Sequence, residues 1–184
     1  MKKETALLVI VILVVGGLIG AIVSNQSTKS SDKENQDTHV SATVDSQKDI
    51  QILNDLLKAE PNNRNAWVQL GNKYFDTNNF MEAIDAYDNA LAIDDNDPNV
   101  LTDQGIMYRR VGWFGKAIEN FTKANQIDPN HIQSLLNMGI VYRFDLEQNA
   151  KAKDVWLKCL EIDAVSPTAD RVRTMIDHME NGHG

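Results

Sequence analysis

Residues 102–129 read TDQGIMYRRVGWFGKAIENFTKANQIDP, and the order of small and aromatic residues in this stretch occurs three times in the chain. The recurring positions are the glycines Gly71, Gly105 and Gly139, the tyrosines Tyr74, Tyr108 and Tyr142, the alanines Ala83, Ala117 and Ala152, the aromatics Tyr87, Phe121 and Trp156, and the small residues Ala90, Ala124 and Cys159. The glycines lie 34 residues apart, so the stretch is one copy of a repeat. Function is therefore to be sought on the surface that the copies form together.

Each copy predicts two packed helices. The glycine of the first helix lets the second helix approach closely because no side chain stands between them. The small residue of the second helix makes room in return, and the aromatic residues fill the space between helices and between neighbouring copies. The third copy is one residue longer near Gln148 and Asn149, which predicts a looser turn there.

These residues resemble the tetratricopeptide repeat (TPR), whose pattern W-x2-L-G-x2-Y…A-x3-F occurs here as Trp67, Leu70, Gly71, Tyr74, Ala83 and Tyr87. The resemblance implies an all-α fold, a right-handed α-solenoid of three TPR helix pairs. The expected pairs cover about residues 64–97, 98–131 and 132–166. The second and third copies have leucine in place of the tryptophan, and Ala164 replaces the terminal proline of the third.

A solenoid needs polar caps over its ends, and the flanking sequences predict two capping helices. The first is expected at about residues 46–60, with Ser46 and Asp49 as a capping box. The second is expected at about residues 167–181, with Ser166 before it and Gly182 after it. The interaction domain thus covers residues 45–184.

The N-terminal segment, residues 1–23, predicts a membrane anchor. Residues 6–23 contain no charged side chain and as a helix would span about 27 Å, close to the thickness of a bilayer core. The run is long and lacks an A-x-A-like site, which favours an uncleaved anchor over a signal peptide. Lys2 and Lys3 predict a cytoplasmic N-terminus and an extracytoplasmic repeat domain, at the inner membrane if the protein is bacterial.

Residues 24–44 are polar, almost without large apolar side chains, and predict a flexible tether. Within the anchor, Gly16 and Gly20 form G-x-x-x-G, a spacing that lets two membrane helices pack closely. Glycine is also common in membrane helices for other reasons. A homo-oligomer therefore remains an alternative.

The charge of the chain excludes most nucleic-acid functions. The net charge is −8, and residues 1–44 contain four basic and four acidic side chains, so the whole excess falls on residues 45–184. An acidic domain binds nucleic acid and anionic lipid poorly. Cys159 is the only cysteine and is expected to be an inert core thiol.

Catalytic and cofactor motifs are not found in the sequence. We find no G-x-S-x-G, P-loop or G-x-G-x-x-G motif. His178 and His183 lie five residues apart, and we interpret this spacing as chance rather than as a zinc site. Residues 94–97 (DDND) lack the glycine and glutamate of a calcium loop, and we interpret them as helix-end and turn chemistry. The sequence predicts a protein that is not an enzyme and binds no metal or cofactor.

The resemblance places a binding groove on the inner face of the solenoid, along the first helix of each pair. The family positions correspond to Asn65, Val68, Asn72 and Phe75 in the first copy, Asn99, Thr102, Ile106 and Arg109 in the second, and Gln133, Leu136, Ile140 and Arg143 in the third. Arg109 and Arg143 are expected side by side, where they would suit a carboxylate, unless each pairs with a local acid.

The family also contains domains that grip the carboxylates of chaperone tails, and this chain matches them poorly. Asn72 fits, but Val68 and Gln133 replace lysines and Asp103 replaces an asparagine. The predicted function is therefore a noncatalytic, membrane-tethered scaffold that binds a helix or tail of another protein. Envelope complex assembly, as in cytochrome c maturation, is one setting for such a scaffold, and self-assembly through the solenoid and the anchor is the alternative.

Overall fold

The computed structural model describes residues 32–182 of the chain, with side chains from residue 45 onward. In this range it consists of eight α-helices and a short π-helix, without strands, so the all-α prediction is confirmed. The helices are α2 (Asp32–Ala59), α3 (Arg64–Asp76), α4 (Phe80–Ile93), α5 (Pro98–Arg110), α6 (Phe114–Ile127), α7 (Ile132–Ile140), η1 (Val141–Asp145), α8 (Asn149–Ile162) and α9 (Pro167–Asn181).

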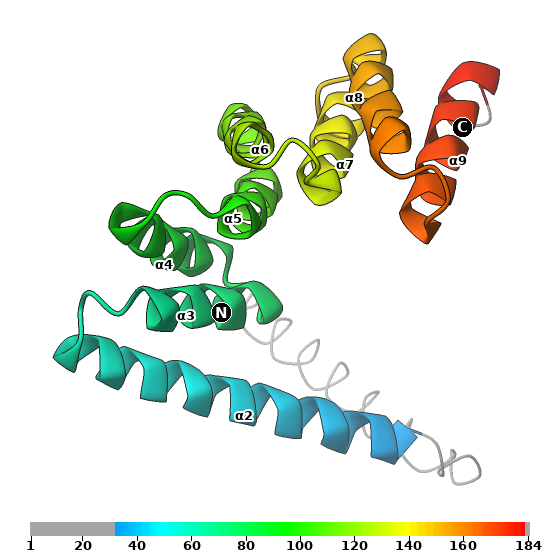
Figure 1. The fold of residues 1–184 in the computed structure, drawn as a ribbon. Helices are drawn as coiled ribbons and strands as arrows, with labels where there is room; N and C mark the ends of the chain where they lie inside the picture. The colour runs from blue at the N-terminus through cyan, green and yellow to red at the C-terminus, as the bar shows by residue number, and fades with distance from the viewer. Residues whose placement is uncertain (1–31, 183–184) are drawn as a thin grey trace, which may run out of the picture. The chain divides into compact units, whose positions relative to one another are not determined.

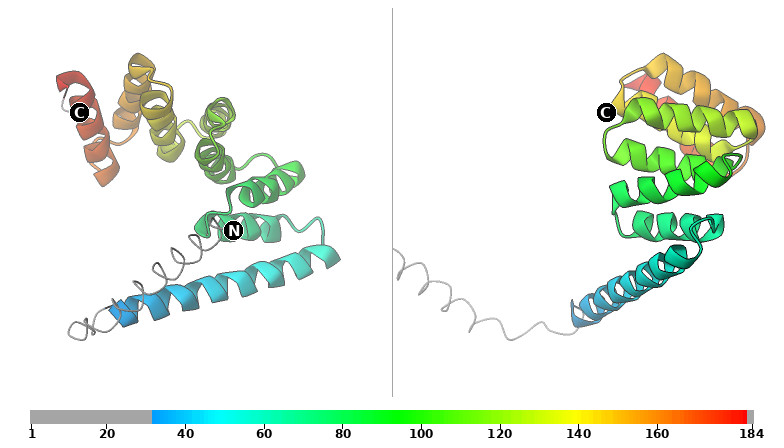
Figure 2. Two further views of the ribbon diagram at one scale, coloured as in Figure 1. Left: turned by 180° about the vertical axis from the view of Figure 1, so that it is seen from behind. Right: turned by 90° about the vertical axis from the view of Figure 1, so that its left-hand side faces the viewer.

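The helices from α3 onward form successive antiparallel pairs, as the predicted repeat requires (Figure 1). Helices α3 and α4, α5 and α6, and α7 and α8 pack within each pair, and α4, α6 and α8 contact the first helix that follows. Figure 2 shows the same pairs layered one after another within the unit Asp45–Gly184. The result is a solenoid-like array in which each pair contacts its neighbours.

The repeated glycines hold the two helices of each pair together. A Cβ atom added to Gly71, Gly105 or Gly139 would lie closer than 3.0 Å to the aromatic ring that faces it. These rings belong to Tyr87, Phe121 and Trp156, none of which exposes any surface. The predicted close approach of the two helices is therefore confirmed in all three pairs.

The extra residue of the third copy is absorbed by a π-helix rather than by the turn alone. In each pair one backbone N–H of the turn donates to the carbonyl of the repeated tyrosine. The bonds are Asn79 to Tyr74, Trp113 to Tyr108 and Gln148 to Tyr142, so the closed ring contains one more residue in the third pair. The wider turn of η1 takes up this residue, and Glu147 enters the left-handed region with φ of 55°.

The first capping helix begins earlier than predicted. Helix α2 starts at Asp32, so residues 32–44 of the segment expected to be a tether are helical, and Ser46 lies inside the helix rather than at its cap. Residues 24–60 contain neither glycine nor proline, so nothing in this stretch interrupts a helix once it has formed. Asp49, expected in the capping box, instead forms an ion pair with Lys73 of α3 at 2.7 Å.

The apolar face of α2 covers the start of the array. Leu53 and Leu57 pack with Ala66, Leu70 and Ala86 in one buried cluster, which is the capping role expected of this helix.

The second capping helix is confirmed with its predicted ends. The hydroxyl of Ser166 accepts the N–H of Ala169 at 3.2 Å, and Pro167 is the first residue of α9. Gly182 ends the helix in the left-handed conformation. Val172 is fully buried in the cluster that also holds Trp156.

The predicted anchor, residues 1–23, lies outside the described residues. Within residues 32–182 no helix is long and apolar enough to cross a membrane.

Candidate functional site

The residues predicted to line the groove lie on the first helices of the three pairs, namely α3, α5 and α7, with Arg143 in η1. Most of them keep exposed surface. Four are exposed: Asn65, Asn72, Asn99 and Gln133. Six are partly exposed: Val68, Phe75, Ile106, Arg109, Ile140 and Arg143.

Two of the predicted groove residues are buried and contribute no surface. Thr102 is 1% exposed and Leu136 is 2% exposed. The Thr102 hydroxyl donates to the carbonyl of Pro98 at 2.7 Å, and Leu136 packs in the cluster around Trp156. The position three residues before each glycine is therefore a packing position in the second and third pairs.

The two groove arginines do not form the shared rim that the sequence predicts. Arg109 holds Asp145 through two hydrogen bonds, from Nε at 2.5 Å and from a terminal nitrogen at 3.3 Å. Both side chains are more than two-thirds buried, so the charge of Arg109 is already compensated. Arg143 instead donates to the Asn149 side chain at 3.0 Å and lies over the Phe144 ring.

The Arg109–Asp145 pair connects the second and third repeats. Asp145 is the last residue of η1, the segment that takes up the extra residue of the third copy. Pairing with a local acid was the alternative interpretation of these arginines, and it holds for Arg109. The sequence offered no signal for this partner, since the two residues are 36 positions apart.

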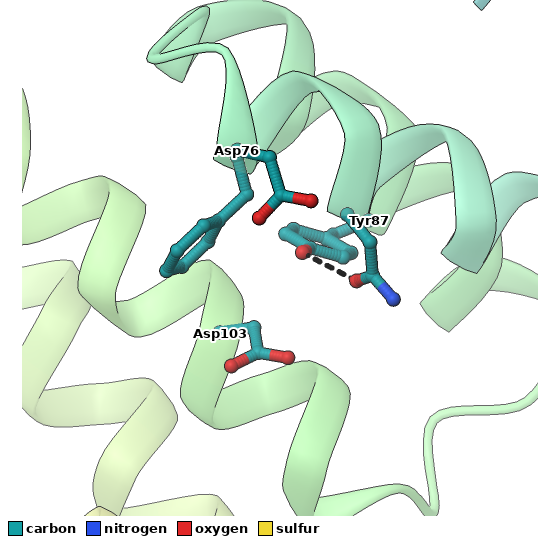
Figure 3. A pocket seen from close by; sticks show the side chains of 5 residues that line it. Asp76, Tyr87 and Asp103 are labelled. Carbon is teal, nitrogen blue, oxygen red and sulfur yellow. Dashed lines mark hydrogen bonds between the residues drawn. The ribbon is translucent and has the colours of Figure 1, made fainter. Parts of the chain in front are cut away.

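A pocket of about 260 Å³ opens between α3 and α5 (Figure 3). Asn72 and Phe75, both predicted groove residues, line it together with Asp76, Tyr87 and Asp103, which the prediction did not include. Figure 3 shows Asp76 and Asp103 on opposite sides of the Tyr87 hydroxyl. That hydroxyl donates to the side-chain oxygen of Asn72 at 2.8 Å.

The pocket is negatively charged. Burial, reinforced by the charge of Asp97, raises the pKa of Asp103 to about 6. Burial also raises the pKa of the Tyr87 hydroxyl, with further contributions from the charges of Asp103 and Asp76. Both carboxylates therefore act on the same hydroxyl from two different repeats.

The sequence contains signals of unequal strength for the three pocket residues that the prediction did not include. Asp76 lies four residues after the predicted groove residue Asn72, so the same helix face could have pointed to it. Asp103 stands out in the sequence only as a mismatch to the chaperone-binding pattern. Tyr87 was assigned to the core, which is confirmed by its burial, but its hydroxyl also reaches the pocket.

The acidic run at residues 94–97 has the structural role predicted for it. Asp97 caps α5 by accepting the N–H groups of Asn99 and Val100, and it pairs with Arg64 at 2.6 Å. Cys159 is buried as predicted, and burial raises the pKa of its thiol to about 11. Within the described residues no group of three or more His, Cys, Asp or Glu could hold a metal ion.

Comparison with known protein families agrees with this geometry. Residues 65–97 and residues 99–131 each match the tetratricopeptide repeat family. The chain contains two tetratricopeptide repeats. The third helix pair lies outside these matches, although Gly139 and Trp156 meet in it as their counterparts do in the first two TPR units.

Solved structures share the fold at low sequence identity. The crystal structure of MamA is 21% identical, with a TM-score of 0.70 over 86% of this chain and 87% of that one. MamA from Desulfovibrio magneticus RS-1 is 20% identical, with a TM-score of 0.63 over 68% of this chain and 70% of that one. The first TPR of Spaghetti (RPAP3), bound to the HSP90 peptide SRMEEVD, is 22% identical, with a TM-score of 0.59 over 65% and 92%. No curated protein sequence matches the chain.

Proposed function

We propose that the chain is a noncatalytic scaffold that holds a segment of another protein against the inner surface of α3, α5 and α7. The main supporting observation is that different residues of these helices form the core and the exposed surface. Their glycines and buried residues make the core, while a row of exposed polar side chains and partly exposed apolar ones runs across successive repeats. Such a row suits an extended peptide or an amphipathic helix.

The solved relative with a bound peptide supports this use of the fold and also marks a difference. SRMEEVD, the HSP90 peptide bound to the RPAP3 domain, contains three acidic side chains. This chain presents Asp76 and Asp103 in its pocket, and the guanidinium of Arg109 is occupied by Asp145. An acidic tail of that kind would meet like charge here, so we propose a partner of different chemistry.

We further propose that residues 6–23 anchor the scaffold in a membrane, with the repeats on the extracytoplasmic side. The support is the uncharged run and the two lysines that precede it. Confinement to a membrane raises the effective concentration of the scaffold near membrane-bound partners. Assembly of envelope proteins, as in cytochrome c maturation, is the process that this arrangement would serve.

Peptide selection tests the scaffold function. Random twelve-residue peptides displayed on phage are selected against the full chain, and the affinities of selected peptides are then measured. A bulky tyrosine is placed at an exposed groove position on α7 with Gln133→Tyr, and at an exposed position on α6, the second helix of the preceding pair, with Glu119→Tyr as the control. We expect Gln133→Tyr to weaken binding at least tenfold and Glu119→Tyr to leave it unchanged.

Thermal melts of both variants verify that the fold is intact. Failure to select any peptide, or equal binding by both variants, would contradict the proposed groove.

A further inference from the structure

We propose that the pocket between α3 and α5 receives a lysine or arginine side chain of the partner segment. This inference rests on the proposed function and specifies the chemistry that the scaffold recognises. It differs from the expectation drawn from the sequence, in which two arginines would bind a carboxylate of the partner.

The pocket is built by two repeats, which makes it part of the shared surface rather than a local feature of one helix. Asp76 comes from the last turn of α3, and Asp103 comes from the middle of α5. Their carboxylates lie on opposite sides of the Tyr87 hydroxyl (Figure 3). A cationic group entering the pocket would therefore find oxygen atoms on more than one side.

The negative charge of the pocket is not neutralised by the chain itself. Within residues 45–182, neither Asp76 nor Asp103 forms an ion pair or a side-chain hydrogen bond. Lys73, which also interacts electrostatically with Asp76, pairs with Asp49 at 2.7 Å, and Arg64 pairs with Asp97 at 2.6 Å. Asp103 is partly buried, whereas Asp76 is exposed, so Asp103 gains more from an incoming cation than Asp76 does.

Tyr87 gives an independent indication that the pocket accepts hydrogen-bond donors. The residue is fully buried, so its oxygen is held in a fixed position at the pocket. The hydroxyl hydrogen is already donated to Asn72, which leaves a lone pair of the oxygen as an acceptor. An ammonium or guanidinium group supplies only donors, so it complements this atom and both carboxylates.

The remaining wall and the volume also suit a single organic cation. The side chain of Phe75 contributes an aromatic ring, and such rings attract ammonium and guanidinium groups. The pocket, at about 260 Å³, is smaller than the roughly 300–1,000 Å³ of sites that bury drug-sized ligands. It therefore fits one side chain better than a whole small molecule.

The test uses peptides selected against the full chain, their affinities, and variants that remove one negative charge each. Asp103→Asn and Asp76→Asn change the pocket, whereas Asp154→Asn removes the same charge from an exposed position on α8. In each peptide the basic residues are replaced singly by norleucine, which removes the charge and keeps the aliphatic stem.

We expect the selected peptides to share a lysine or arginine at one position. Asp103→Asn should weaken their binding at least tenfold, whereas Asp154→Asn should leave it unchanged. Replacing that basic residue by norleucine should weaken binding to the native chain by the same factor. It should not weaken binding to Asp103→Asn any further, because the two changes remove the same interaction.

Groove-bound peptides without a preferred basic position, or full affinity in Asp103→Asn, would overturn the inference and leave the scaffold function standing. Failure to select any peptide would overturn both. A calorimetric titration of calcium chloride that gives heat with the native chain but not with Asp103→Asn would assign the pocket to a metal ion and would also overturn the inference.

Discussion

At the scale of single residues, the close contact between glycine and an aromatic ring determines the geometry of each helix pair. Gly71, Gly105 and Gly139 differ in their neighbours along the chain, yet each faces a ring that leaves no room for a Cβ atom. Gly115 is also helical, but a Cβ atom added to it would meet no atom of another packed residue within 4 Å. The same substitution should therefore have opposite effects at the two kinds of site.

We predict that Gly105→Ala lowers the free energy of unfolding by about 1–3 kcal/mol, because the added methyl group must displace the Phe121 ring. Gly115→Ala is the matched control and should raise that free energy by up to about 1 kcal/mol, since alanine favours the helix and meets no neighbour. Urea unfolding measures both. Equal effects of the two substitutions would contradict the packing described for the repeats.

The ion pair between Arg109 and Asp145 should couple the second and third repeats. We predict that Arg109→Ala and Asp145→Ala each destabilise the domain by about 1–3 kcal/mol, because each leaves a largely buried charge without its partner. The double variant should lose less than the sum of the two. The exposed pair Lys58–Asp55 serves as the control, and its disruption should leave the free energy of unfolding almost unchanged.

At the scale of elements, the third pair shows how one additional residue is accommodated. Its turn residue in the left-handed region is Glu147, whereas the second pair has Gly112 there, with φ of 80°. Glycine adopts this conformation without strain and glutamate does not.

We predict that Glu147→Gly stabilises the domain by about 0.5–1 kcal/mol and that Gly112→Ala destabilises it by about the same amount. Thermal melts of the two variants provide the comparison. A lower melting temperature for Glu147→Gly would show that the third turn is not strained in the way we describe.

The helices themselves were predictable because their packing repeats. Three copies of glycine, tyrosine and a second aromatic residue specify helix pairs whose interior is the same each time, so the pattern could be found in the sequence alone. The start of α2 was not predictable in this way. Its first part has no apolar stripe to mark it, and the polar composition of residues 24–44 resembles that of a tether.

The π-helix illustrates a second limit of sequence-based prediction. The extra residue near Gln148 was visible in the sequence, but its position does not reveal whether the helix or the turn absorbs it. The structure places it in η1, whose last residue, Asp145, pairs with Arg109. The predicted arginine rim failed for this reason.

At the scale of the whole molecule, the ionised carboxylate of Asp103 destabilises the folded state at the pocket where we propose that a partner binds. The pKa of Asp103 is raised from 3.8 to about 6, so the folded state holds the proton more firmly than the unfolded state does. Stability should therefore fall as the pH rises from about 4 to about 6. A difference of this size corresponds to at most about 3 kcal/mol.

We predict that Asp103→Asn is more stable than the native chain at pH 7.5, by about 1–2 kcal/mol, and that this advantage disappears near pH 4. Peptides with a basic residue should show the opposite dependence and bind more tightly as the pH rises through about 6, because only the ionised carboxylate attracts the cation. Unfolding and binding at both pH values, with Asp154→Asn as control, test this relation. Equal stability of Asp103→Asn and the native chain at pH 7.5 would contradict it.

The groove residues were predictable as a surface but not as a binding chemistry. Family positions identified exposed residues such as Asn65 and Asn99 correctly, because helical spacing alone decides which face they occupy. The partners of Arg109 and the position of Asp103 beside Tyr87 depend on contacts between repeats. Such contacts do not follow from the spacing within one copy.

Site-specific photocrosslinking in intact cells tests most directly whether the inner face of the repeats binds another protein. A photoreactive amino acid replaces Ile106 on the inner face of α5, and a second preparation carries it at Glu119 on α6 as the control. We predict that one other protein is crosslinked from Ile106 and not from Glu119. Capture of the chain by itself would support the homo-oligomer instead, and equal capture from both positions, or none from either, would contradict the binding groove.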